Sequence, residues 1–116
     1  MNTEHELVTI ANFIKNTVVE DSIGSMETNL SLTIGFSQRV GELLSDAEFN
    51  LAKKREQCLN DLLSNEDETE TQRKAKLDSW VAEEKRTFQN LKMIFSNLKA
   101  LRFVLMQAIK TRRDGK

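Results

Sequence analysis

The sequence predicts an all-α protein, a long antiparallel helical hairpin of the coiled-coil type with a short N-terminal helix packed at its open end. Three observations support this fold class. The chain has no proline and four glycines, too few turn signals for a β-sandwich or barrel. Apolar residues in the second half repeat at heptad spacing. The acidic segment 64–71 separates two long helical stretches. We expect the 116 residues to form one domain, 1–116.

The first helix is predicted over about residues 4–20. Thr3 and Glu6 have the spacing of a capping box, which satisfies free backbone amides at a helix start. After them, apolar residues recur every three or four positions, the period of one helix face. These residues are Leu7, Ala11, Ile14 and Val18.

The second helix is predicted over about 26–64, although part of it reads as a strand. Apolar residues alternate with small or polar ones over 30–37, which is typical of a strand. We predict a helix because no second strand-like run could pair with it and satisfy its backbone. Gly35 and Gly41 either weaken this helix or mark the close approach of another. A helical stripe runs through the segment: Met26, Leu30, Ser37, Val40, Leu44, Ala47, Leu51, Cys58 and Leu62.

The third helix is predicted over about 70–112, capped by Thr69 and Gln72. Its apolar seam steps alternately by four and three residues, as in a coiled coil. A turn near 66–68 would fold it back on the second helix and place Trp80 opposite Lys54. The seam contains Leu77, Val81, Glu84, Phe88, Leu91, Phe95, Leu98, Arg102, Leu105 and Ile109.

Catalytic and metal chemistry find no support in the residue types present. His5 is the only histidine and Cys58 the only cysteine, so no nucleophilic triad or metal-ligand set can be assembled. The sequence also lacks a glycine-rich phosphate loop. We therefore expect no enzyme activity, no metal and no cofactor. We expect Cys58 to be a small buried hydrophobe.

The charge and hydropathy patterns indicate in which cellular compartment we expect the protein. No apolar run approaches the ~20 residues that span a bilayer, and the N-terminus lacks the basic start of a signal peptide. With one cysteine and no internal disulfide, these features favour a cytoplasmic protein without a membrane. Residues 91–116 carry seven basic side chains and one acidic. Such an end complements the helix dipole or faces an anion, and an amphipathic contact with a membrane surface is a weaker alternative.

A candidate single-stranded nucleic-acid site lies around the only tryptophan. Basic groups beside an aromatic ring provide cations for phosphates and a surface for base stacking. Trp80 could instead pack against the second helix, and interleaved acidic residues dilute the positive charge. The predicted site consists of Arg73, Lys74, Lys76, Trp80, Lys53 and Lys54.

A second candidate surface is apolar. The stretch 91–109 shows more than one apolar face, which a two-helix contact cannot cover completely. We therefore predict a homo-oligomer, or another protein partner, that contacts Leu91, Ile94, Phe95, Leu98, Leu101, Leu105 and Ile109.

Three segments of the chain show a resemblance to a known family. They are RVGELLSDAEFNLAKKREQ (39–57), TETQRKAKLDSWV (69–81) and LKALRFVLMQAIKTRR (98–113). The chain resembles small helical proteins encoded by bacteriophages, including the recombination-mediator family. Members of that family load a recombinase onto single-stranded DNA and assemble as oligomers. The resemblance implies DNA binding by Lys74, Lys76, Leu77, Asp78 and Trp80, and self-association through 91–109.

Two hypotheses for the function follow. The first is a non-enzymatic, oligomeric phage-type recombination accessory factor that binds single-stranded DNA, a recombinase, or both. The alternative is a protein-interaction or scaffold module, such as a phage accessory or anti-defence factor, that binds no nucleic acid.

Overall fold

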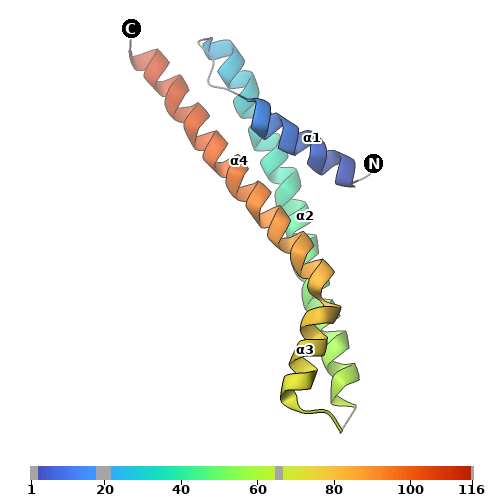
Figure 1. Cartoon of the computed structure of the whole chain (residues 1–116). Helices are drawn as coiled ribbons and strands as arrows, with labels where there is room; N and C mark the ends of the chain where they lie inside the picture. The colour runs from blue at the N-terminus through green and yellow to red at the C-terminus, as the bar shows by residue number, and fades with distance from the viewer. Residues whose placement is uncertain (1–2, 18–21, 65–66, 116) are drawn as a thin grey trace. The chain divides into compact units, whose positions relative to one another are not determined.

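A computed structural model describes residues 3–17, 22–64 and 67–115. These ranges contain α-helices and no strand, which confirms the predicted all-α class and the helical hairpin. The helices are α1 (Thr3–Asn16), α2 (Ile23–Leu63), α3 (Glu70–Trp80) and α4 (Ala82–Asp114) (Figure 1).

The start of α1 differs from the prediction. The helix begins at Thr3 itself, so Thr3 is not the capping residue that precedes it. Both carboxylate oxygens of Glu6 accept hydrogen bonds from Arg39 on α2 instead of closing a capping box. The charged guanidinium group of Arg39 is a stronger hydrogen-bond donor to a carboxylate than a neutral backbone amide is. The helix ends at Asn16 and Thr17 is already non-helical, whereas the end was predicted near residue 20, which lies outside the described residues.

The chain divides into two compact units, and the first contains residues 1–41 and 93–116. In this unit α1 crosses α2, while α4 runs alongside α2 (Figure 1). The direction is antiparallel, because Arg113 near the end of α4 pairs with Glu27 near the start of α2. The core between α2 and α4 is formed by Met26, Leu105 and Ile109, with Ile23, Leu30, Leu101 and Ala108 packed around it.

The strand-like alternation over 30–37 is explained by two helical stripes on α2. One stripe, represented by Leu30, packs toward α4. The other faces α1, where the rings of Phe36 and Phe13 meet edge to face with centroids 5.0 Å apart. Because each stripe has helical spacing, their superposition along the chain gives an apparent period of two. Thr33 is fully buried, and its hydroxyl donates to the carbonyl of Asn29 at 2.7 Å, so the polar group is satisfied within the helix.

The second unit, residues 42–92, contains the second half of α2, all of α3 and the start of α4. Its core consists of Leu51, Cys58 and Val81, with Leu77 and Phe88 packed against it. The buried, unpaired Cys58 occupies the small apolar seam position predicted for it.

The predicted third helix is interrupted at Val81. This residue has φ −99° and ψ 3°, in the sparsely populated bridge region between helix and strand. Hydrogen bonds of helical spacing continue on both sides: the Val81 amide donates to the Leu77 carbonyl, and the Lys85 amide donates to the Val81 carbonyl. Val81 is 1% exposed. The β-branched side chain is stiff, and its packing in the core accompanies a local departure from the helix at this one residue.

Candidate functional site

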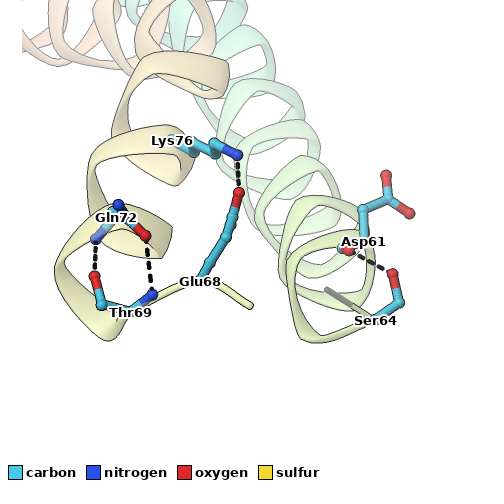
Figure 2. Close-up of polar contacts among 6 residues, drawn as sticks. All are labelled: Asp61, Ser64, Glu68, Thr69, Gln72 and Lys76. Atoms are coloured by element: carbon cyan, nitrogen blue, oxygen red, sulfur yellow. Dashed lines mark hydrogen bonds and ion pairs between the residues drawn. The ribbon is translucent and has the colours of Figure 1, made fainter. Parts of the chain in front are cut away.

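The basic segment around Trp80 begins at a well-defined helix start. The Thr69 hydroxyl accepts a hydrogen bond from the Gln72 amide at 3.2 Å, and the Gln72 side-chain oxygen accepts one from the Thr69 amide at 3.1 Å (Figure 2). This reciprocal pair is the predicted capping box. It fixes the start of α3 and therefore the direction in which the first turns of the helix present their basic residues.

Lys76 is engaged by an acidic residue of the same unit. Its ammonium group pairs with the Glu68 carboxylate, which lies just before α3 (Figure 2). A paired lysine offers less positive charge to a phosphate than a free one, because a ligand must compete with the carboxylate for it. Lys76 is therefore a weaker phosphate contact than its sequence position suggests.

Lys54 is also paired with a carboxylate of the same unit. The Lys54 ammonium donates to the Glu84 carboxylate at 3.0 Å. This contact raises the pKa of Lys54. The pKa of Glu84 is lowered first by a hydrogen bond from its own backbone amide and then by Lys54. Lys54 thus reaches Glu84, one helical turn along the chain from Trp80, the residue predicted to lie opposite it.

The remaining members of the predicted nucleic-acid site are more open. Trp80 is 43% exposed at the last position of α3. Lys53 and Lys74 are exposed and make no ion pair within the described ranges. Arg73 is half-buried. An accessible indole with two accessible ammonium groups in the same unit is the part of the predicted site that keeps the required chemistry.

The predicted partner interface lies largely inside the chain. Leu91, Leu98, Leu105 and Ile109 are at most 6% exposed. Ile94, Phe95 and Leu101 are partly buried. These side chains fill the hairpin core, so few of their atoms are open to a partner.

The most exposed large apolar side chains of α2 and α4 lie at positions for which no interface role was predicted. On α4 they are Met93, Phe103, Val104 and Met106; on α2 they are Leu32, Phe49, Leu59 and Leu63. Phe103 and Phe49 are 65% and 67% exposed. These residues could have been identified from their positions outside the heptad seam. A large apolar residue that does not face the other helix of the hairpin faces solvent or a second protein.

The first unit also contains a hollow between α1 and α2. Its volume is about 510 Å³, and Ile10, Leu32 and Phe36 supply much of its apolar wall. The Glu6–Arg39 pair lies in the same lining, with an Nε–Oε2 distance of 2.7 Å. The hydrogen bond from Arg39 lowers the pKa of Glu6. Gly35 lines the hollow, and a methyl group added there would meet no atom within 4 Å.

Gly41 and Gly35 have different surroundings. Both glycines were predicted either to weaken the helix or to mark the approach of another helix. A Cβ at Gly41 would lie 3.6 Å from a ring carbon of Phe95, which is an ordinary contact with α4. Gly41 therefore marks an approach of α4 to α2, whereas Gly35 does not.

Among the residues that the structure describes, no group of three or more histidine, cysteine, aspartate or glutamate side chains could hold a metal ion. In the same ranges, no helix is both long and apolar enough to cross a bilayer. No family model, curated protein or solved structure matches the chain.

Proposed function

We propose that the chain is a non-enzymatic helical protein that acts through protein–protein contacts, beginning with self-association. The observation that supports this proposal is the exposure of large apolar side chains on regular helix faces. Phe49, Leu63 and Phe103 are each more than 60% exposed. Large contiguous apolar patches on a protein surface mark interaction sites, and interfaces are enriched in phenylalanine and methionine.

Sedimentation velocity across a concentration series tests the proposal. The full chain should sediment faster as its concentration rises. The variant Phe103→Ser should self-associate only at higher concentration, because it removes an exposed apolar group from the proposed interface. It should leave the fold of the single chain intact, because helix packing does not require this side chain. The matched control is Gln107→Ser, an exposed polar residue one turn further along α4. A chain that remains monomeric over the whole range would refute self-association.

A second candidate function, single-stranded nucleic-acid binding, is favoured by the exposure of Trp80. Since Trp80 is the only tryptophan, its fluorescence reports directly on base stacking at the site. Quenching of this fluorescence by an unlabelled single-stranded oligonucleotide should be strong at low salt and should weaken steeply as the salt concentration rises. The recombination-accessory role implied by the resemblance depends on this activity.

Variants separate this candidate from the first. Trp80→Phe keeps a stacking surface, whereas Trp80→Ala removes it. A Lys53→Glu/Lys74→Glu double variant removes the two accessible cations, and Lys85→Glu/Arg86→Glu makes the same charge change at exposed positions elsewhere. Binding that is lost equally in both double variants would indicate non-specific attraction to the whole chain and would overturn a site at Trp80.

A further inference from the structure

The outer face of α4 in the first unit combines apolar and basic groups. Residues three or four positions apart lie on the same face of a helix, and Lys99, Arg102, Phe103, Met106 and Lys110 follow this spacing. All five are exposed, including Arg102, which the heptad seam had placed toward the second helix. No acidic residue occurs anywhere from 93 to 113. This face therefore fits a partner surface that is both apolar and acidic.

The outer face of α2 in the second unit has the complementary character. Its exposed residues recur at helical spacings, with intervals of three, seven, three and four positions. They are Asp46, Phe49, Glu56, Leu59 and Leu63. Lys53 also lies on this face, so its charge is acidic on balance rather than uniformly negative. A carboxylate precedes each of Phe49 and Leu59 by three residues.

We infer that the partner of the α4 outer face is the α2 outer face of a second copy of this chain. This inference rests on the proposed self-association and names its surfaces. Phe103 and Met106, which lie between two cations, and Phe49, which lies between two carboxylates, would be removed from water. The flanking cations Arg102 and Lys110 would lie against Asp46 and Glu56.

The dimensions of the two faces are compatible. At 1.5 Å per residue, the α4 face from Lys99 to Lys110 extends about 16 Å, and the α2 face from Asp46 to Leu59 extends about 20 Å. On α4 each apolar residue is preceded by a cation four positions earlier, and on α2 by a carboxylate three positions earlier. The two flanking charges have similar separations: Arg102 and Lys110 are eight residues apart, about 12 Å along the axis, and Asp46 and Glu56 are ten residues apart, about 15 Å.

Two different surfaces can meet reciprocally in a two-fold dimer, in which each face of one copy contacts the other face of the second copy, or head to tail. A head-to-tail pair leaves one face of each kind unused unless the assembly closes into a ring. The difference between the two faces gives the inference a sharp genetic test, since either face can be altered separately and the two altered chains can then be mixed.

The experiment compares three full-length chains by sedimentation equilibrium at low and at high salt. One carries Arg102→Glu and Lys110→Glu, one carries Asp46→Lys and Glu56→Lys, and the control carries Lys85→Glu and Arg86→Glu. All the altered residues are exposed, and circular dichroism checks that each chain remains helical. Each face variant should self-associate about tenfold or more weakly than the unaltered chain, because like charges now meet. The control should be unchanged.

Mixing the two face variants should restore association in a mixed complex, since the reversed faces are again complementary. Association of the unaltered chain should also weaken with salt, which screens charge pairs. If the face variants associate as strongly as the unaltered chain, or if mixing restores nothing, these faces are not the interface, although self-association itself would stand. If the unaltered chain never associates, the proposed function fails together with the inference.

Anionic vesicles and a single-stranded oligonucleotide are tested in parallel as other occupants of the basic face. Binding to either that is lost in the Arg102→Glu/Lys110→Glu variant, without any rescue on mixing, would overturn the assignment of this face to a second copy.

Discussion

Leu105 gives the strongest test of the packing between α2 and α4. Its side chain is 0% exposed and packs with Met26 and Ile109. The substitution Leu105→Ala removes three carbon atoms, and at ~0.8 kcal/mol for each buried carbon the transfer cost is roughly 2.4 kcal/mol. A cavity adds to this value because the surrounding helices relax only partly, so we expect a loss of about 3 kcal/mol.

The loss is measured by thermal unfolding at the lowest practical concentration, where self-association contributes least. For a chain of this length, 1 kcal/mol corresponds to about 4 °C, so the midpoint should fall by roughly 12 °C. The matched control is Val104→Ala, because Val104 is the neighbouring residue and is 45% exposed. It should change stability by less than about 1 kcal/mol. Equal shifts in the two variants, or a loss below about 1 kcal/mol for Leu105→Ala, would refute the assignment of Leu105 to the core.

Three further predictions concern local features. Gly35→Ala should raise the unfolding midpoint by a few degrees, because alanine favours a helix by about 1 kcal/mol over glycine and the added methyl group meets no atom within 4 Å; a lower midpoint would contradict this. Thr69→Ala should cost about 1 kcal/mol in urea unfolding by removing the capping box with Gln72, and an unchanged midpoint would show that the cap is dispensable. The pKa of Glu6 is below its ordinary 4.5 because of the hydrogen bond from Arg39, so the stabilisation by this pair should be complete above that value and disappear as the pH falls through the lowered pKa. NMR titration of the Glu6 carboxyl measures this pKa, and Arg39→Gln should return it to the ordinary value.

The sequence was sufficient to predict the helices because their main determinants are local. The capping pair Thr69 and Gln72 and the seam residues of α4 act through neighbours three or four positions away. The departure at Val81 could not be predicted in the same way. Val81 belongs to the predicted seam like Leu98 and Leu105, which are similarly buried and lie within regular helix. Neither its residue type nor its burial therefore marks the departure in the sequence.

The candidate sites were less predictable because charge and exposure depend on pairing across the hairpin. Lys54 and Lys76 have the sequence context of phosphate ligands, but each meets a carboxylate in the structure. The apolar residues Phe49 and Phe103 do not fit the heptad seam, and no role was predicted for them. Their exposure follows from where the seam points, because residues on the far side of a helix from its partner remain in solvent.

The register of the hairpin shows why such pairings are hard to read from a heptad sequence. Sliding one helix past the other by one turn moves seam residues by three or four positions, and another seam residue then takes each place. Apolar burial therefore changes little between neighbouring registers. Features that do not repeat every turn discriminate between them: the Lys54–Glu84 pair in one unit and the contact of Gly41 with Phe95 in the other. Periodicity assigns Glu84 and Phe95 to the seam of the third predicted helix, but it does not assign their partners Lys54 and Gly41 to the seam of α2. The register, and with it the surroundings of Trp80, therefore depends on pairings between helices that periodicity alone does not specify.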